Sequence, residues 1–336
     1  SDGQTHIQPR VHPLDTDHGL PGQDLVYPGE FVILKDRTTG SAWTEGLAGD
    51  GGARKPSSET FASKYKSSLP DWATNGAFLV NRRLRQDVAG FWKWCGEEAK
   101  GSSGGFTQEA LAAKIFGRWP SGCPLSRSPE HDLTDLGADA RANNAYAFAV
   151  PHAIRTAPED KYPKATSIDL DGLVCPLGAH TRKMNPRDGV NDVSTPLRRR
   201  IMRRGLPYGP PLANRRSGVD DGVDRGLQFV AYCSSIEEQF EFLQKKWANS
   251  ASSPTDPTCI DPIIGQVAKG ASKPFTFTDA NGKEHKVDAQ SAGKGGASQF
   301  VVATGGGYFF APSMSALMLL SKAGDVVARV PRSVVG

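Results

Sequence analysis

Apolar and polar residues recur at regular intervals in several parts of the chain, and these intervals predict both strands and helices. Residues 76–84 and 226–233 alternate and are rich in β-branched and aromatic residues, which is typical of strands. The first of them is followed by apolar residues at helical spacing, which predict an amphipathic helix to about Ala99. Thr107 is placed to cap a second helix at residues 108–116.

The C-terminal third repeats this succession of strands and helices. Ser235 and Glu238 form a capping box ahead of an apolar helical face that ends at Trp247. A hairpin is expected around residues 281–282, because Asn-Gly favours a tight turn. Residues 300–303 and 308–311 predict two strands around a glycine turn at 305–307, followed by a helix at 313–321 and a last strand at 326–330. The fold class expected is α+β, an antiparallel sheet with helices on one face.

Composition narrows the class of protein without naming a function. The 336 residues are 38% hydrophobic and 23% charged, with a net charge of +4 that is mostly dispersed, so neither nucleic acid nor a membrane is expected as a partner. No apolar run approaches the roughly 20 residues of a membrane-spanning helix. The five cysteines are odd in number and lack C-x-x-C spacing, which favours reduced, buried thiols and a cytoplasmic location.

Two stretches carry candidate chemistry. Residues 175–187 place one histidine, His180, among small residues with basic residues close behind. The spacing alone leaves two interpretations open, a ligand for a large flat group or a histidine satisfied within the core. Residues 198–209 are rich in arginine, which favours a solvated basic helix end, with a phosphate-binding patch as the alternative.

These stretches resemble the dye-decolourising peroxidase family. Residues 179–187 read A-H-T-R-K-M-N-P-R, which is similar to the family's proximal-histidine signature, and residues 201–210 resemble its distal-arginine segment. Six further blocks follow the family order, at residues 71–80, 117–125, 226–232, 242–249, 261–265 and 306–313. The resemblance implies ferredoxin-like α+β units with haem b, iron protoporphyrin IX, held between two of them. It implies a peroxidase that reduces hydrogen peroxide and oxidises phenolic or dye-like donors.

Residue roles follow from matched positions. His180 matches the proximal iron ligand, and Asp261 is the expected acceptor for its other ring N–H. Arg203 matches the distal arginine, with Arg204 as the alternative if the alignment shifts by one residue. The distal acid is expected at Asp2, in a Ser-Asp-Gly that resembles the tail of the family's G-x-x-D-G; a chain terminus without a role is the other interpretation.

Other matched positions are expected to line the pocket or carry electrons. Leu227 and Phe229 match apolar residues of the distal side, although a plain core role fits them too. Tyr208 and Trp247 match positions that carry electrons from bulky donors, and ordinary packing is the alternative for both. Three arginines, Arg82, Arg182 and Arg187, are candidates for the haem propionates by charge, and surface partners are the alternative for them.

The expected domains are residues 1–125, completing a first ferredoxin-like unit with an insertion near 37–69; a loop-rich linker at 126–165; and a haem-binding unit at 166–336. Because little precedes Asp2, a shorter N-terminal chain is expected to complete the first unit. Two other functions stay open, a non-catalytic haem carrier and a basic module that binds anions or nucleic acid. The sequence does not specify the natural electron donor or the oligomeric state.

Overall fold

The computed structural model describes residues 31–35, 42–43, 71–102, 105–149, 161–163, 168–190, 196, 199–268, 270–289 and 299–328. Its elements run in chain order as follows: β1 (Leu34–Lys35), β2 (Ala42–Trp43), η1 (Asp71–Ala73), β3 (Ala77–Gln86), α1 (Val88–Gly101), α2 (Gln108–Phe116), α3 (Thr134–Ala138), α4 (His180–Met184), β4 (Met202–Tyr208), η3 (Arg215–Ser217), β5 (Gly226–Cys233), η4 (Ile236–Glu241), η5 (Leu243–Ala248), β6 (Pro274–Thr278), β7 (Glu284–Asp288), β8 (Val301–Ala311) and α6 (Met314–Ala328). No helix among these residues is both long and apolar enough to cross a membrane.

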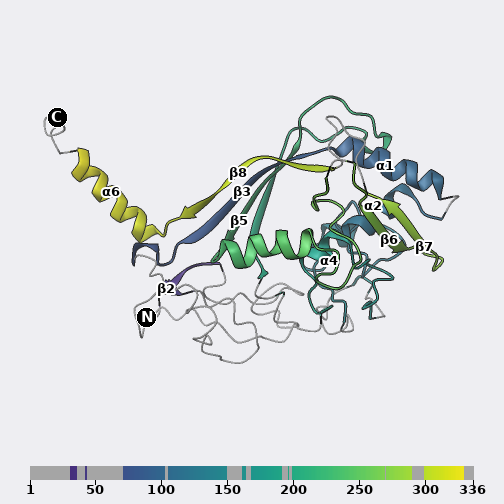
Figure 1. Cartoon of the computed structure of the whole chain (residues 1–336), viewed down its shortest axis with the longest axis horizontal. Coiled ribbons are helices and arrows are strands. Elements are labelled where there is room, and N and C mark those ends of the chain that lie inside the picture. The colour runs from purple at the N-terminus through teal and green to yellow at the C-terminus, as the bar shows by residue number, and fades with distance from the viewer. Residues whose placement is uncertain are drawn as a thin grey trace.

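The main sheet has four antiparallel strands in the order β4-β5-β3-β8. Its two central strands, β3 and β5, are the first and third of the four along the chain, as in a ferredoxin-like unit. Helices α1 to α4 lie in the connection from β3 to β4, and η4 and η5 lie in the connection from β5 to β8. The α+β ferredoxin-like fold expected from the sequence is confirmed. Figure 1 shows the long strands β3, β5 and β8 side by side, with α1, α2 and the β6–β7 hairpin gathered at one end and α6 projecting from the other.

The strand expected at residues 76–84 does not complete a separate first unit. As β3 it pairs with β5 on one side and with β8 on the other, so it is central to the same sheet as the C-terminal strands. Alternation of side chains indicates that a segment is a strand, but not which strands it pairs with. Both edges of β3 are paired, so this strand leaves no open edge for a further chain.

Local signals placed several elements correctly. Thr107 Oγ1 accepts from the backbone N–H of Ala110 and begins α2, which ends at Gly117 in the left-handed region with φ of 82°. Ser235 Oγ accepts from the N–H of Glu238 at the start of η4, as expected. The return bond comes from Gln239 instead, whose Oε1 accepts from the N–H of Ser235, because Glu238 pairs with Arg199. The segment continues as wide, π-helical turns through η5.

Three expectations in the second half of the chain were wrong or incomplete. The glycine turn at 305–307 lies inside one continuous strand, β8. Gly306 has φ of 142°, and a Cβ there would lie 2.2 Å from the carbonyl oxygen of Asn81, so glycine lets β8 pair closely with β3. The last strand expected at 326–330 is helical as far as Ala328, in α6. The arginine-rich segment was not expected as a strand, yet it forms β4.

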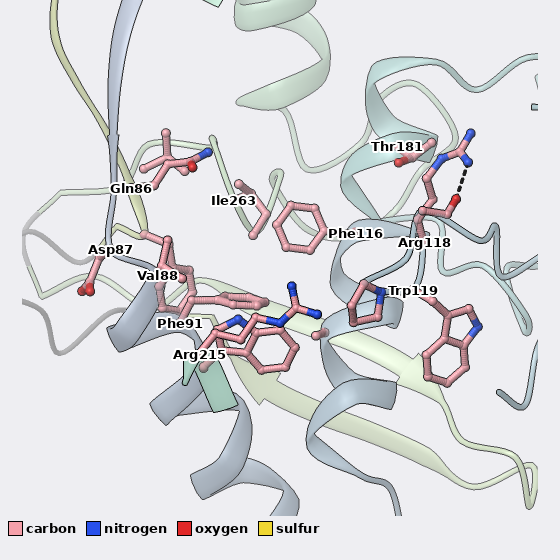
Figure 2. Close-up of a pocket in the computed structure, with 16 residues that line it drawn as sticks. Gln86, Asp87, Val88, Phe91, Phe116, Arg118, Trp119, Thr181, Arg215 and Ile263 are labelled. Carbon is pink, nitrogen blue, oxygen red and sulfur yellow. Dashed lines mark hydrogen bonds between the residues drawn. The ribbon is translucent and has the colours of Figure 1, made fainter. Parts of the chain in front are cut away.

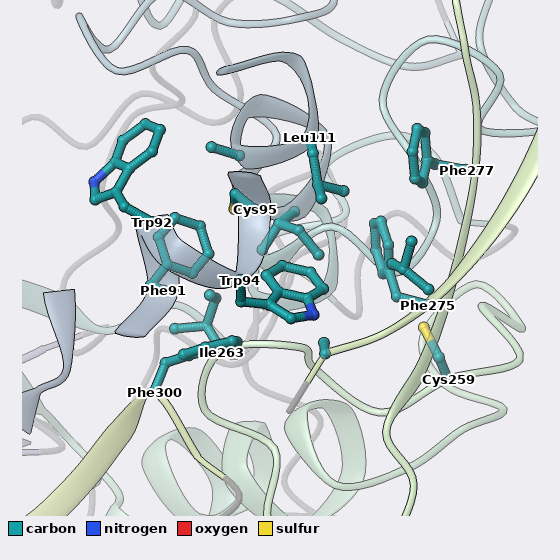
Figure 3. Close-up of a cluster of buried hydrophobic side chains, with 14 residues drawn as sticks. Phe91, Trp92, Trp94, Cys95, Leu111, Cys259, Ile263, Phe275, Phe277 and Phe300 are labelled. Carbon is teal, nitrogen blue, oxygen red and sulfur yellow. The ribbon is translucent and has the colours of Figure 1, made fainter. Parts of the chain in front are cut away.

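A large aromatic cluster lies between α1, α2 and the β6–β7 hairpin (Figure 3). Phe91 contacts Phe116 edge-on at 5.5 Å between ring centroids and Phe300 at 5.2 Å. Cys259 and Ile263, which lie two residues before and two residues after Asp261, both belong to this cluster. The cluster therefore fixes the loop that carries Asp261. All five cysteines are buried and free, as predicted.

Candidate functional site

His180 begins the short helix α4 and lies at the end of a tightly held loop. Its side chain is 29% exposed, whereas the preceding Ala179 is completely buried. The ring Nδ1 lies 2.8 Å from Oδ2 of Asp261, which is 81 residues further along the chain. The edge of the Phe116 ring contacts the imidazole, with 6.2 Å between ring centroids. No other described residue bonds the ring, which leaves Nε2 available to a ligand.

Asp261 is buried completely, and both of its carboxylate oxygens accept hydrogen bonds. Its Oδ1 accepts from the backbone N–H groups of Ile263 and Ile264 at 2.8 and 2.9 Å. Burial by itself would raise the pKa of this carboxyl, but the charge of His180, their hydrogen bond and the two N–H donors together hold it below its usual value. The group is therefore an ionised acceptor aimed at His180 Nδ1.

Lys183 connects α4 to the same loop. Its side chain is fully buried, and its Nζ donates to the carbonyl oxygens of Ser250, Ser253 and Cys259 at 2.9, 3.0 and 2.9 Å. Burial lowers the pKa of this ammonium below the ordinary lysine value. Because Lys183 is one helical turn after His180 and Cys259 is two residues before Asp261, these bonds hold the two halves of the pair in register.

The sheet register gathers the expected distal residues on one face. Arg203 of β4 lies opposite Ala231 of β5, Gly205 opposite Phe229, and Pro207 opposite Leu227. Directly paired residues point to the same side of a sheet, and alternate residues of one strand do too. Arg203, Leu227 and Phe229 therefore share a face, whereas Arg204 points to the other face.

That face is the one on which α4 lies. Phe240 of η4 packs with Val80 and Ala231, which belong to the face of Arg203. The helical segment then continues through η5, which contacts α4. Figure 1 shows this segment running along one side of the sheet toward α4. The sheet face with Arg203 and the helix with His180 thus lie on the same side of the sheet.

A cavity of about 380 Å³ borders the His180–Asp261 pair. Thr181, Phe116 and Ile263 line it, and each is next to the pair in the chain or in contact with it. The opposite wall comes from the end of β3 and the start of α1 (Figure 2). The lining is mainly apolar and includes several aromatic rings, with Arg118 and Arg215 as its cations.

The three arginines expected at the haem propionates have other partners. Arg182 is completely buried, with Nη1 on Asp169 and the Cys175 carbonyl and Nη2 on the carbonyl oxygens of Asp169 and Leu170. Its buried Nε has no partner among the described residues. These bonds hold together the loop that precedes α4, and Arg182 thereby stabilises the position of His180 at the start of this helix.

Arg187 and Arg82 are also held by their surroundings. Arg187, at φ of 51°, donates to the carbonyl oxygens of Asn144 and Tyr146, and its guanidinium lies 3.8 Å from the Tyr146 ring centroid. Arg82 donates to the Asn81 and Gly307 carbonyls within the sheet. Charge alone suggested all three as propionate partners, but only the tertiary structure shows where their donors point.

The two residues expected to carry electrons differ in exposure. Trp247 is only 2% exposed and packs edge-on against Phe242. A bulky donor at the surface therefore has no direct contact with it. Tyr208 lies under the guanidinium of Arg83, at 4.3 Å, and its hydroxyl has no partner among the described residues. Burial and the nearby Asp224 raise the pKa of Tyr208.

Two points complete the comparison with the sequence. Asp2 lies outside the described residues. Arg215, which lies at the cavity, was not predicted as a functional residue, because nothing in its local pattern distinguishes it from a solvated arginine.

Comparison with known proteins identifies the class. Residues 162–259 match the family described as "Dyp-type peroxidase, C-terminal". A dye-decolorizing peroxidase of Auricularia auricula-judae is 36% identical over 326 residues, which cover 92% of this chain and 53% of that protein. Peroxidase 2 of Mycetinis scorodonius is 33% identical over 312 residues, 89% of this chain and 52% of that protein.

Solved structures agree. An ancestral D-type dye decolorizing peroxidase matches with a TM-score of 0.63 and 32% identity, over 90% of this chain and 58% of that chain. A dye-decolorizing peroxidase in complex with 2,6-dimethoxyphenol matches with a TM-score of 0.59 and 32% identity, over 89% of this chain and 57% of that chain. Over about nine tenths of its length the chain is similar to dye-decolourising peroxidases, as its sequence motifs implied. It spans about half the length of the curated relatives it matches.

The donor set around His180 fits the haem that this family uses. A partly exposed imidazole, fixed through Nδ1 by a buried carboxylate and open at Nε2, is the arrangement of a histidine that ligates iron. The residues present are therefore compatible with a haem held by His180.

Proposed function

We propose that this chain forms the haem-binding part of a peroxidase that reduces hydrogen peroxide and oxidises phenolic or dye-like donors. The cofactor proposed is haem b, with His180 as the proximal ligand through Nε2. The observation that carries the proposal is the 2.8 Å contact between His180 Nδ1 and the buried Asp261, on the side of the sheet to which Arg203 points.

Each residue has a separate task in this proposal, while the haem supplies the redox chemistry with peroxide. Asp261 holds the Nδ1 proton of His180, which fixes the tautomer, leaves the lone pair on Nε2 and makes the ring more basic. Arg203 keeps its charge and stabilises the negative charge that develops on the departing peroxide oxygen. Leu227 and Phe229, on the same face, keep water from that space.

Proton transfer during the peroxide step is proposed for Asp2, which takes a proton from one peroxide oxygen and returns it to the other. Electron transfer from bulky donors is proposed for Tyr208, and for Trp247 as an interior relay, since Trp247 is buried. A relative bound to 2,6-dimethoxyphenol supports phenols as the donor class.

Partner and location stay predictions. The pairing of β3 does not support the prediction of a shorter N-terminal chain, because both edges of this strand are already paired within the sheet. A surface that such a chain could cover exists on α6, where Met314, Met318 and Leu320 are 69%, 60% and 58% exposed. Five buried free thiols support the proposed cytoplasmic location. The absence of nucleic acid as a partner rests on the mild net charge.

Spectroscopy of the native assembly tests the function. Purified protein should show a Soret band that changes promptly with one equivalent of hydrogen peroxide. His180→Gly should lose the band's native form and regain it with added imidazole. A band that ignores peroxide would favour the carrier function, and failure to bind added haem would refute the cofactor.

The sheet register supplies a matched pair for the distal role. Arg203→Leu should slow the reaction with peroxide by about 10² to 10³, the usual cost of losing one oxyanion donor, while haem binding persists. Arg204→Leu removes a neighbouring charge from the other face and should change the rate only a few-fold. Equal effects of the two substitutions would refute the role of Arg203.

A further inference from the structure

The cavity beside His180 has the walls of a site for a single aromatic ring. Phe91, Trp92, Phe116 and Phe300 contribute rings to its lining. Phe91 contacts the other three edge-on, with centroid separations of 5.7, 5.5 and 5.2 Å. A volume of about 380 Å³ is at the small end of ligand pockets, so one ring with short substituents fits it and a polycyclic dye does not.

One cation of the lining is placed to meet an anion. The guanidinium of Arg215 lies 5.6 Å from the centroid of the Trp92 ring. Figure 2 shows it beside Phe91, reaching into the space below Phe116. Among the described residues the guanidinium of Arg215 has no hydrogen-bond acceptor and no ion pair, and only its backbone carbonyl is engaged, by the N–H of Gly218. Its donors are therefore available to a ligand in the cavity.

The turn that carries Arg215 is anchored to the helices of the cavity wall. Gln108 Nε2 donates to the carbonyl oxygens of Trp92 and Arg216, at 2.6 and 3.2 Å. Arg216 forms an ion pair with Glu109 at 2.7 Å. Gly218, with φ of 65°, lies so close to α1 that a Cβ would be 2.7 Å from Lys93 Cα. These contacts fix Arg215 over the cavity without using its own donors.

The other charged residues of the lining are already engaged. Arg118 Nη1 donates to the carbonyl oxygens of Gly122 and Asn143, at 2.7 and 2.9 Å. Asp87 Oδ1 accepts from the N–H of Gly90 at 2.8 Å and caps α1, and its carboxylate points away from the Arg215 guanidinium in Figure 2. The cavity is therefore complementary to a ligand that carries one negative charge next to an aromatic ring.

We propose that this cavity binds a monocyclic aromatic carboxylate, with the ring among Phe91, Trp92 and Phe116 and the carboxylate on Arg215. Guanidinium and carboxylate pair through two parallel hydrogen bonds, and aromatic edges contact an aromatic guest well. The inference deepens the proposed function, on which it rests for the redox role of the ligand: a hydroxybenzoate bound here is a phenolic donor. The binding itself needs no turnover.

The binding experiment uses haem-loaded protein and benzoate, which lacks the phenol group and reports binding alone. Isothermal titration and quenching of tryptophan fluorescence should give a saturable site in the wild-type protein. Arg215→Gln should weaken benzoate about tenfold or more, as expected for loss of a charged hydrogen bond. Arg216→Gln, whose side chain faces Glu109 instead, should leave the affinity within about twofold. Benzyl alcohol, a neutral analogue, should bind both variants equally.

Several outcomes would overturn the inference. Absence of benzoate binding in the haem-loaded protein, with binding in the haem-free protein, would mean that the cofactor fills the cavity. Equal loss in the two variants would mean that general surface charge attracts the ligand. If benzoate binds as expected but peroxide leaves the Soret band unchanged, the proposed peroxidase function fails while the binding site stands.

Discussion

Lys183→Met is expected to weaken both the stability of the protein and the coupling between His180 and Asp261. The methionine keeps the length and the apolar stem of the side chain and removes the ammonium. Three carbonyl oxygens then lose their donor, that of Cys259 in a buried bond and those of Ser250 and Ser253 in partly buried ones. Since residues 250–259 lead directly into Asp261, the loop gains freedom at the point where it meets α4.

The magnitude follows from the bonds that are lost. A hydrogen bond to a charged group contributes about 1.5–3 kcal/mol, and leaving a buried acceptor without a partner costs about 1–3 kcal/mol. The cost of desolvating the ammonium, which also lowers its pKa, offsets part of the free energy that these hydrogen bonds contribute. We expect a net loss of about 3 kcal/mol in the free energy of unfolding, which corresponds to roughly 4 °C in Tm for a chain of 336 residues.

Lys114→Met is the matched control. Lys114 is also a buried lysine, with Nζ on the carbonyl oxygens of Leu173 and Val174 at 3.1 and 2.7 Å, but it does not bond the loop that leads to Asp261. Both variants should unfold at lower temperature. Only Lys183→Met should lower the iron–histidine stretching frequency measured by resonance Raman in the reduced, haem-loaded protein, because a weaker bond to Asp261 makes the imidazole a poorer donor. Equal frequencies in the wild-type protein and both variants would refute the positioning role of Lys183.

Three further predictions concern stability. Gly178→Ala should lower the free energy of unfolding in urea by about 1–3 kcal/mol, because the new Cβ would lie 2.3 Å from Cys259 Sγ. A second change, Cys259→Ala, should recover part of this loss, and no recovery would contradict the clash. Burial lowers the pKa of Lys273 to about 8, so between about pH 8 and 10.5 the unfolded state binds a proton that the folded state lacks. The free energy of unfolding should therefore rise with pH over this range, by about 2–3 kcal/mol relative to the variant Lys273→Met. Equal pH dependence of the two proteins would contradict this prediction. Ser235→Ala should cost about 1 kcal/mol by thermal melting through loss of the cap on η4, with Ser252→Ala, in an exposed loop, as the neutral control.

Much of the sheet and its helices could be predicted from local pattern. The predicted spans agree with β5 and α2, and they agree with β3 and α1 to within two residues, because alternation and capping are properties of neighbouring residues. β4 was missed because its charged residues and a proline conceal the strand, which lies at the edge of the sheet where Pro207 can be accommodated. The unbroken course of β8 through three glycines required knowledge of how closely β3 approaches it.

The candidate site could be predicted only through the family resemblance. Nothing in the spacing of His180 and Asp261 indicates that residues 81 positions apart form a hydrogen bond. The assignment of Arg82, Arg182 and Arg187 to propionates relied on charge, and the structure shows carbonyl and carboxylate partners for them within the protein. Arg215 had no local signal, because its place over Trp92 depends on a turn that folds back onto α1 and α2.

The sequence by itself determined the resemblance to dye-decolourising peroxidases, the types of most elements and His180 as the candidate iron ligand, because motifs, caps and periodicity are properties of adjacent residues. Only the tertiary structure decided that β3 is central to the C-terminal sheet, that Arg203, Leu227 and Phe229 share one face, and that Arg215 is the cavity's available cation. Strand pairing and the partners of long charged side chains depend on contacts between distant segments. Those contacts form when the chain buries its apolar surface, and local pattern does not encode them.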